Sequence, residues 1–444
     1  MWGSPGTAIG PLSIVVFLFS LAAGAAAFAA QPATAAGGPA ARHADRSGGA
    51  SATHRGKSGP VLTEGDALRL GLADATFQQL QDARVDVARS DVVEAGLPPN
   101  PELELSYESA DGAGDPSDTK LRLSQTFDTS GRRGLRQKAA EARLEATRWQ
   151  TEGDRAERAA QVRSRFYSVL HEQEWTVVLK AWDARIGEAA NIVRDRASAG
   201  EASGYDLRRL EHERALARTE RDEVAGRLAQ AWEALLALLD LGERRYAAVD
   251  GRLLPASPPP LDALAPRLDS RPDLLALRQR EEASRLVRQA GERAAVPDIT
   301  VGLGAKRVSE LEREDWGVLL DVSVPLPVFD RGQAAVSRAE AESRVVAGEY
   351  QLAVREAQAS LRGLWQKAVE LQRAASRLRA TDVPQAMSLA QTARSAYQGG
   401  EIGILELLDA YRSVKETEMR ALDLALETRL ATLELERISG GADR

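Results

Sequence analysis

The chain has 444 residues, no cysteine and a formal net charge of −7 at pH 7, with 28% charged and 5% aromatic residues. The missing cysteines exclude disulfides, thiolate metal sites and a lipid carried on an N-terminal cysteine, and the predominance of Ala, Leu, Arg and Glu is typical of long packed helices. Residues 31–60 hold four basic side chains and one acidic, and residues 1–30 hold none, so the body from Val61 carries a net charge of −10, which argues against a nucleic-acid-binding face.

Residues 1–30 are interpreted as a signal peptide. The apolar run from Ile14 to Phe28 has about the length of a signal-peptide core, and Ala27-Phe28-Ala29 offers a small-x-small cleavage site. A single membrane anchor is the alternative, but the run is diluted by alanine and is too short at its most hydrophobic part. No Lys or Arg precedes the core, so either the start codon is misplaced or the amino terminus alone supplies the positive charge. Residues 31–60 are predicted to be a disordered leader, because they cannot bury enough apolar surface to fold.

Residues 61–250 form the first of two predicted structural repeats. A helix is expected from Thr63 to about Leu97, where two prolines stop it. The stretches 102–108 and 120–127 then alternate apolar and polar residues, which is the two-residue period of strands with one wet face. A polar loop joins the two stretches, so they predict a β-hairpin.

A helical pattern without a strong breaker follows over about 131–199, roughly 100 Å at 1.5 Å per residue. A pattern of this length indicates a coiled coil or a helical tube. Ser203 and Asp206 have the spacing of a capping box, and a returning helix is expected over 204–241. The helices over 63–97 and 204–241 together nearly equal the long helix. We therefore expect two shorter rods, stacked end to end, to lie against one long rod.

The same order of elements returns after a proline-rich linker. The linker is 251–260, the second structural repeat is 261–440, and residues 441–444 are left as a tail. Its first helix is expected to kink or restart at Pro272, and its long helix to cover 333–398. Two alternating strands lie between them, with apolar positions at Ile299, Val301, Leu303, Ala305, Val318, Leu320, Val322 and Val324. The last helix carries its apolar residues at a spacing that gives one buried stripe.

The two long helical patterns end in similar tips, 200 residues apart. Gly200-Glu201 aligns with Gly400-Glu401, and Asp206 aligns with Glu406. The sequence therefore contains two copies of one helical hairpin tip.

The four alternating strands have the length of tilted membrane strands. Four strands cannot close a membrane barrel, because the smallest closed barrels need about eight. The chain therefore either assembles with further copies or uses its strands as a small soluble sheet.

The order of these segments resembles the TolC-like outer membrane efflux proteins. The segments are NPELELSYE, LRLSQTF, GEAS, VPDITVGLG, SVPLPVFDRG and GGEIGILELLDAY, in that order along the chain. Within the family the chain looks most like the outer membrane subunits of heavy-metal cation efflux systems, of the cobalt/zinc/cadmium or copper/silver type, on the strength of Asn100-Pro101-Glu102-Leu103 and Leu123-Ser124-Gln125. The resemblance covers nearly all of the chain from Val61 to Gly440.

The resemblance implies a mostly α fold with a small β part, in which long helical hairpins are duplicated in tandem. A homotrimer would share a 12-strand barrel in the outer membrane, in contact with its lipid, and an α-helical barrel in the periplasm. It would act as a passive conduit that receives substrate from a periplasmic adaptor and an inner membrane RND-type pump. Heavy-metal cations are the favoured exported substrate, and organic compounds or secreted protein are the alternatives. Adaptor-driven untwisting of the inner helices would open the tips.

The resemblance also assigns roles to residues at the tips. Adaptor hairpins would dock at Gly200, Glu201, Ser203, Gly204, Gly400, Glu401 and Gly403. Glu406 and Asp409 match the acidic positions that line the closed periplasmic aperture, and Tyr397 matches an aromatic residue of the gate. A latch of tyrosine, arginine and aspartate is not implied in that form, because Ile402 stands where some members carry a basic gate residue.

Two interpretations of the tip acids stay open. Asp206 and Glu406 are also the acids that capping and the helix dipole favour at a helix start. Asp409 lies one turn beyond Glu406 and hence on the same face, so three copies would place six carboxylates around one aperture. Such a ring attracts cations, and protonation or divalent ions would alter the gate.

An enzyme is not expected, and neither is a cofactor or a metal site. The sequence has no nucleophile motif, no phosphate loop and no pair of histidines at metal-ligand spacing. The alternative function is a periplasmic adaptor or a coiled-coil scaffold. Two hairpins and four isolated strands disfavour the adaptor, and a scaffold would not need strands with an apolar face.

Overall fold

The computed structural model describes residues 59–109, 117–200, 202–241, 246–310 and 313–440. The predicted signal peptide, nearly all of the predicted leader and the predicted tail lie outside these ranges, as does Glu201 of the first tip. All of the described helices and strands belong to one unit, Lys57–Arg444.

The start of the first repeat differs from the prediction of one helix over 63–97. Two helices occur there, α1 (Glu64–Leu72) and α2 (Ala75–Gly96). The break lies at Asp74, whose carboxylate accepts the backbone N–H of Phe77 at 2.7 Å. An aspartate that accepts an N–H bond in this way begins a new helix, and this local competition explains why the prediction was wrong.

A two-stranded parallel sheet joins the start of the first repeat to its end. Strand β1 (Val61–Thr63) pairs with β4 (Ala248–Asp250). This pairing was not predicted, because three residues are too few to show an alternating pattern.

The four predicted strands are confirmed and form one antiparallel sheet. They are β2 (Glu102–Ser109), β3 (Ser117–Phe127), β5 (Ile299–Glu310) and β6 (Arg313–Ser323), in the order β2-β3-β5-β6. The β3–β5 contact joins the two repeats, with Phe127 opposite Ile299 and Ser117 opposite Ser309. Strands β2 and β6 are the two edges.

One face of this sheet is apolar and uncovered. The register places Leu103, Leu123 and Leu303 side by side on that face, with Leu320 opposite Leu303 on β6. Large apolar side chains of the strands that are exposed are Leu103, Leu105, Tyr107, Leu121, Leu123, Phe127, Val301, Leu303, Trp316, Val318, Leu320 and Val322. The predicted wet face lies on the other side, where Arg122 pairs with Glu104 at 2.5 Å and with Asp321 at 3.0 Å.

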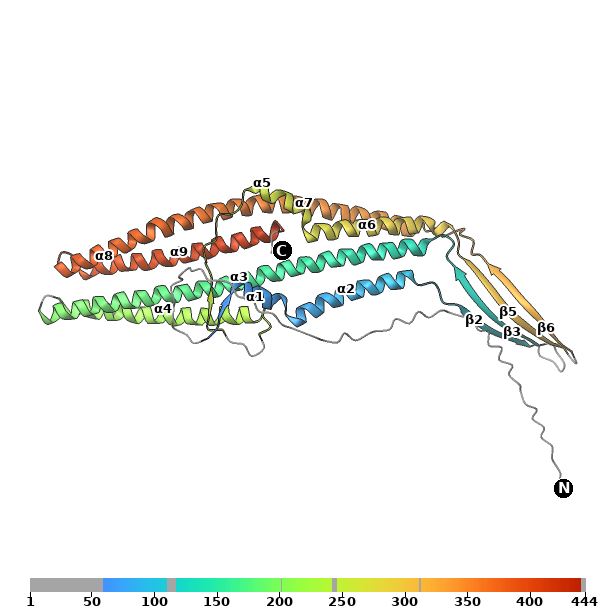
Figure 1. Cartoon of the computed structure of the whole chain (residues 1–444), viewed down its shortest axis with the longest axis horizontal. Coiled ribbons are helices and arrows are strands. Elements are labelled where there is room, and N and C mark those ends of the chain that lie inside the picture. Colours follow the sequence, from blue (N-terminus) through green and yellow to red (C-terminus); the bar gives the residue numbers. More distant parts are fainter. Residues whose placement is uncertain (1–58, 110–116, 201, 242–245, 311–312, 441–444) are drawn as a thin grey trace, which may run out of the picture. The chain divides into compact units, whose positions relative to one another are not determined.

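The first long helix and its two companions are arranged as predicted. Helix α3 (Arg132–Ser198) has 67 residues, and α4 (Gly204–Leu236) returns along it, ending at Leu236 rather than near Leu241. Both α2 and α4 pack on α3, so two shorter rods do lie along one long rod (Figure 1). At 1.5 Å per residue α3 separates the strands from the tip by about 100 Å.

The second repeat follows the same plan with more interruptions. After α5 (Leu261–Leu264) and the 3₁₀ turn Ala265–Ser270, α6 (Pro272–Glu292) restarts at Pro272 as predicted. The long helix consists of α7 (Gln333–Arg377), a π-helical turn (Leu378–Asp382) and α8 (Val383–Gly399). The final helix α9 (Ile404–Ile438) packs against α3, α7 and α8.

Several separate clusters along the helices make up the core. One holds the tips together, a second surrounds β1 and β4, a third lies between α5, α7 and α9, and a fourth lies between α3 and α6. Buried alanines such as Ala189, Ala190, Ala390 and Ala393 allow the helices of the tip cluster to approach closely. Within the described ranges no helix is both long enough and apolar enough to cross a membrane.

Candidate functional site

The two hairpin tips share one backbone geometry. Gly200 and Gly400 both adopt the left-handed conformation, with φ of 78° and 77°. The N–H of Gly200 donates to the carbonyl of Ala197 at 3.0 Å, and the N–H of Gly400 to that of Tyr397 at 3.1 Å. Residues with a Cβ adopt this conformation at a cost, so glycine ends each helix here. The predicted duplication of the tip is therefore also a duplication in structure.

The helices that follow the two tips begin differently. Ser203 and Asp206 form the predicted capping box, with each side chain bonded to the other residue's backbone N–H at 3.3 Å. The equivalent position before α9 is Gly403, which has no side chain to cap the helix. The carboxylate of Glu406 instead lies over Gly403. A Cβ added at position 403 would be 2.9 Å from Glu406 Oε2. Asp206 is thus a capping residue, whereas α9 begins without a side-chain cap.

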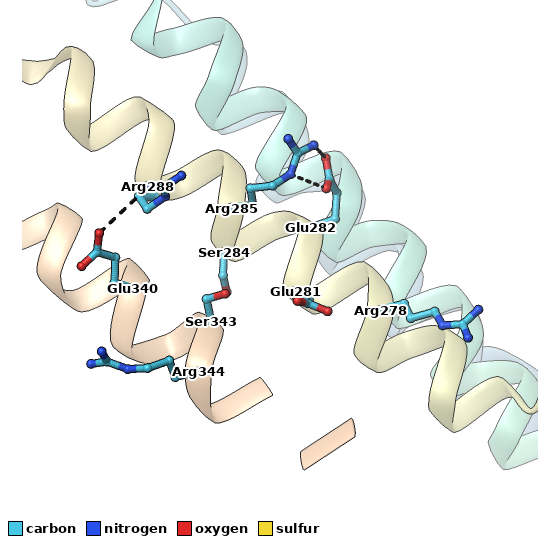
Figure 2. Close-up of a pocket in the computed structure, with 9 residues that line it drawn as sticks. All are labelled: Arg278, Glu281, Glu282, Ser284, Arg285, Arg288, Glu340, Ser343 and Arg344. Atoms are coloured by element: carbon cyan, nitrogen blue, oxygen red, sulfur yellow. Dashed lines mark hydrogen bonds and ion pairs between the residues drawn. The ribbon is translucent and has the colours of Figure 1, made fainter. Parts of the chain in front are cut away.

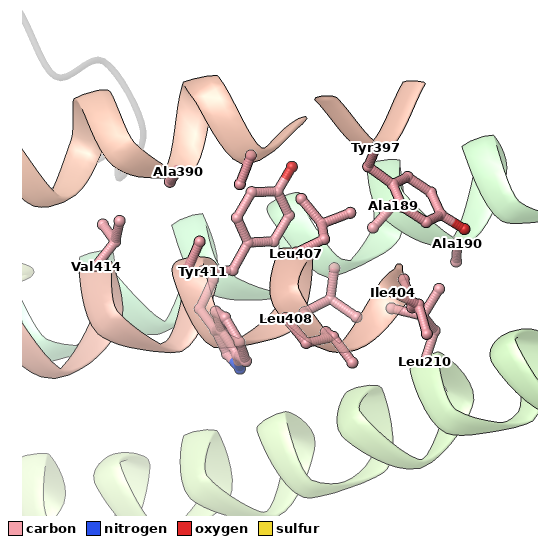
Figure 3. Close-up of a cluster of buried hydrophobic side chains, with 14 of the residues drawn as sticks. Ala189, Ala190, Leu210, Ala390, Tyr397, Ile404, Leu407, Leu408, Tyr411 and Val414 are labelled. Carbon is pink, nitrogen blue, oxygen red and sulfur yellow. The ribbon is translucent and has the colours of Figure 1, made fainter. Parts of the chain in front are cut away.

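The tip cluster binds the two hairpins to each other (Figure 3). Ile404, Leu407 and Leu408 of α9 are buried against Ala189 and Leu210 of the first hairpin. This contact explains why the apolar stripe of α9 begins immediately after the tip: near the tip, the stripe is the surface that faces α3 and α8.

Tyr397 belongs to this buried contact. It is 4% exposed, and the guanidinium of Arg196 on α3 lies 5.2 Å from its ring centroid. Arg196 also donates to the backbone carbonyl of Tyr397 at 2.6 Å. Burial, with the nearby charge of Asp206, raises the pKa of the Tyr397 hydroxyl, and Arg196 opposes this shift. Tyr397 therefore links the hairpins through cation–π and hydrogen-bond contacts with Arg196.

Glu406 and Asp409 lie on a different surface. Both are exposed, whereas the residues around them, Leu407, Leu408 and Ala410, are buried. The structure therefore brings the two predicted gate acids together on one open face of α9. It does not bring Tyr397 to that face within one chain.

Four ion pairs between described residues cross from one hairpin to the other beside the tip cluster. Arg185 of α3 reaches Glu418 of α9 at 3.4 Å, and Arg394 of α8 reaches Glu188 of α3 at 3.0 Å. The other two pairs join α9 to α4 and are Arg412–Glu213 and Lys415–Glu220. The sequence patterns did not predict these pairs, because the partners lie about 200 residues apart and no local pattern relates them.

Each tip also presents one exposed apolar side chain that the sequence patterns did not predict. Tyr205 is 64% exposed and Leu405 is 52% exposed, each in the first turn of its returning helix. The duplication aligns position 205 with position 405, so the repeat itself was the signal that would have found them. Together with Gly204 and Gly403 they form the end surface of the two tips.

A surface pocket of about 510 Å³ lies between α6 and α7, away from the tips (Figure 2). Ser284 and Ser343 face each other in it, and Arg285 pairs with Glu282 on its own helix at 2.5 Å. Its rim is a mixture of arginine and glutamate, which is typical of a solvated helix surface. Among the described residues, no group of three or more His, Asp or Glu could hold a metal ion.

Comparison with known proteins places the chain in a family. The family model for outer membrane efflux proteins matches residues 77–240 and 266–441, which is more than half of the chain. The chain belongs to the outer membrane efflux protein family. It is therefore an outer membrane protein whose helices extend into the periplasm, as the resemblance predicted.

One curated relative and two solved structures illustrate the match. The cobalt-zinc-cadmium resistance protein CzcC of Cupriavidus metallidurans is 30% identical over 387 residues, which cover 86% of this chain and 90% of CzcC. The crystal structure of CusC matches with a TM-score of 0.71 at 19% identity, over 85% of this chain and 92% of CusC. The open state of the MtrE outer membrane channel of Neisseria gonorrhoeae matches with a TM-score of 0.67 at 19% identity, over 85% of this chain and 89% of the MtrE chain. The predicted TolC-like fold is confirmed.

Proposed function

We propose that the chain is the channel subunit of a tripartite efflux system and forms a homotrimeric, passive conduit. The observation that carries this proposal is the four-stranded sheet, whose apolar face is bare and whose two edges are unpaired among the described residues. A sheet of this kind is stable in water only if another surface covers its apolar face. A membrane can cover the apolar face once the two edge strands have paired with strands of other copies.

The strand directions allow three copies to close one barrel. All three contacts in the sheet are antiparallel, so the edge strands β2 and β6 run in opposite directions. Strand β6 of one copy can therefore pair antiparallel with β2 of the next. Three copies give twelve strands, an even number within the range of bacterial outer membrane barrels. Register parity places Leu103 and Leu105 on the same outer face as Leu320 and Val322.

The opposite face of the sheet then lines the barrel. It carries the Glu104–Arg122–Asp321 ion-paired row and the Lys306–Asp118 pair, with a 2.6 Å contact in the latter. Asp321 on β6 lies opposite Gly302 on β5, and a Cβ added at position 302 would clash with Oδ1 of Asp321. A polar, charged lining is what a water-filled conduit needs.

The tips would form the opposite, closable end. Glu406 and Asp409 are exposed on one face of α9, so a threefold arrangement that turns this face inward gives a ring of six carboxylates. The exposed tip surface around Gly200, Ser203, Gly204, Gly400 and Gly403 would receive the adaptor, with Tyr205 and Leu405 as its apolar contacts. An inner membrane pump of the RND type would supply energy and select the substrate.

Heavy-metal cations are the substrate that the comparison favours. The relative CzcC is named a cobalt-zinc-cadmium resistance protein. An acidic ring at the aperture would concentrate such cations without binding them tightly. The alternative function, a periplasmic adaptor or a scaffold, does not fit the family to which the chain belongs.

Single-channel conductance in planar lipid bilayers tests the proposal. We expect the double variant Glu406→Ala and Asp409→Ala to conduct more than the original protein, because the shorter alanine side chains leave a wider aperture. The matched control is Asp222→Ala with Glu223→Ala, two exposed acids of α4, which should leave conductance unchanged. Unchanged conductance in the tip variant would contradict the gate assignment, and absence of channels in every protein would contradict the conduit.

A further inference from the structure

The segment between β6 and α7 is an ordered turn. The side chain of Gln333 accepts the N–H of Arg331 at 2.7 Å and donates to the carbonyl of Phe329 at 2.9 Å. Asp330 accepts the N–H of Gly332 at 2.9 Å. Gly332 has φ of 85° and lies so close to α6 that a Cβ there would come within 2.3 Å of the carbonyl of Gly291. Hydrogen bonds within the turn and with the first residue of α7 therefore fix its shape, and Gly332 packs closely against α6.

This ordered turn nevertheless exposes its apolar side chains. Leu326 is 78% exposed, Val328 is 59% exposed and Phe329 is 91% exposed. Phe329 has the largest exposed fraction among the large hydrophobic residues that are exposed in the described chain. Hydrogen bonds that hold a turn in shape while it displays three apolar groups indicate a surface that binds something apolar.

The turn continues the apolar face of the sheet. On β6 the exposed apolar residues fall at even positions, from Val318 through Leu320 to Val322. The same alternation runs past the end of the strand through Val324 and Leu326 to Val328, although Pro325 and Pro327 end the ladder. Exposed apolar residues therefore continue along the chain from β6 into the turn.

The exposed apolar stripe of β6 is shorter than the apolar band of an outer membrane barrel. From Trp316 to Val322 the stripe is about 20 Å long at about 3.3 Å per residue, and a tilt of about 40° reduces its height to about 15 Å. The apolar band of an outer membrane barrel is about 25 Å tall and is bordered by aromatic residues on both sides. The six residues from Val324 to Phe329 supply the missing height at the end where the chain enters α7.

We propose that Val324–Arg331 is an interfacial membrane anchor, in which Leu326, Val328 and Phe329 lie among phospholipid acyl chains just below the headgroups of the periplasmic leaflet. This inference rests on the proposed barrel and adds a lipid contact outside the strands. Arg331 and Arg338 are exposed beside the turn, and Arg338 lines a groove together with Leu326 and Phe329. Their guanidinium groups are suited to the phosphates of that leaflet.

A second copy of the chain is the competing occupant of the turn, and spin-label accessibility separates the two. Because the chain has no cysteine, Leu320→Cys, Phe329→Cys and Leu405→Cys each give one nitroxide site per subunit. The labelled proteins are reconstituted in vesicles of phosphatidylethanolamine and phosphatidylglycerol. Collision rates are then measured with oxygen, which concentrates in lipid, and with a water-soluble nickel chelate. Leu320 reports the barrel and Leu405 the aqueous tip.

We expect the label at position 329 to resemble that at 320, with a severalfold higher ratio of oxygen to nickel collisions than at 405. A high nickel collision rate at 329 would mean that the turn is in water and would overturn the proposal. Low rates for both reagents would mean that another subunit covers the turn, which would also overturn it. If position 320 itself is in water, the barrel fails, and this outcome is distinct from a failure of the anchor alone.

Discussion

The two helical hairpins have matching tips but differently built long helices. In the first hairpin α3 runs for 67 residues without interruption. In the second, the π-helical turn Leu378–Asp382 lies between α7 and α8, directly before Pro384, and none of its five residues is buried. Proline has no N–H, so the carbonyl of Ala380 lacks its usual α-helical donor. The second hairpin is therefore easier to bend than the first.

The packing beside this turn also favours bending. A cavity of about 260 Å³ lies there, lined by Ala375 and Val383 of the long helix and by Ala421 and Ala425 of α9. The pocket is also lined by Arg379 of the turn, by Leu422 of α9 and by residues 251–254, and its open space leaves the turn room to move. A rigid hairpin and a hinged hairpin thus lie side by side, joined near their tips by the buried cluster and four ion pairs. We expect the second hairpin to carry the motion that opens the tip.

The largest expected effect comes from the buried contact between the tips. Leu407 is 0% exposed, whereas its counterpart Leu207 is only partly buried. Leu407→Ala should lower the local free energy of unfolding at the tips by about 2–5 kcal/mol, because it leaves a cavity in the cluster. Leu207→Ala should cost clearly less. Hydrogen exchange of the tip amides measures both, and equal effects would contradict the asymmetry of the cluster.

A reciprocal exchange of residues tests the hinge. Position 184 of α3 corresponds to position 384, and both Ala184 and Pro384 are exposed. Ala184→Pro should destabilise the first hairpin by about 3 kcal/mol, since it removes a helical hydrogen bond and introduces a clash. Pro384→Ala should instead slow hydrogen exchange around residues 378–399 and reduce the frequency of channel opening. An unchanged opening frequency in Pro384→Ala would argue against a hinge at this turn.

A pH effect is expected where α3 meets α9. Burial alone would lower the pKa of His171, but its contacts with Glu172 at 3.3 Å and with Asp423 at 2.9 Å outweigh burial and raise it. Arg227 faces the same group, bonded to Glu172 at 3.0 Å. A raised folded-state pKa means that the stabilisation is complete below the usual value of 6.5 and is lost as the pH rises through the folded-state pKa.

Thermal unfolding at several pH values measures this contribution. The melting temperature should fall as the pH rises above about 6.5, and His171→Gln should remove that part of the fall while keeping a hydrogen bond to Asp423 possible. An identical pH profile for the variant would show that His171 does not contribute.

The smallest effect concerns the start of α9. Gly403→Ser would place the Ser-x-x-Glu pattern before α9, as Ser203 and Asp206 do before α4. We expect a gain of a few tenths of a kcal/mol, because serine improves only slightly on glycine at this position. The change should also draw Glu406 towards the backbone and away from the exposed face. Tip conductance should then shift in the same direction as in the double variant of Glu406 and Asp409, and an opposite shift would contradict the role given to Glu406.

Local patterns were sufficient to predict most of the fold. The alternation in 102–108 and 120–127 predicted β2 and β3, and the repeated glycine before a glutamate predicted both tips. The single helix over 63–97 was wrong because Asp74 bonds to the N–H of Phe77 and starts a second helix. The π-helical turn was not predicted, although Pro384, which follows it closely, is a local signal for an interrupted helix.

Residues of the candidate site could be predicted only where the duplication aligns them or where they share one face of a single helix. Glu406 and Asp409 are one turn apart on α9, so their shared face followed from spacing. The contact of Tyr397 with Arg196 and the ion pair of Arg412 with Glu213 join residues about 200 positions apart. Such contacts arise from the way two hairpins pack, and a single sequence has no local signal for them.

The native mass of the protein, extracted by detergent from isolated outer membranes, tests the central claim most directly. We predict a trimer of the processed chain, because three copies close both edges of the sheet in a twelve-strand barrel and turn its apolar face towards the membrane. A soluble monomer or dimer in the periplasm would contradict this claim, since the bare faces of β2, β3, β5 and β6 would then have no membrane to cover them.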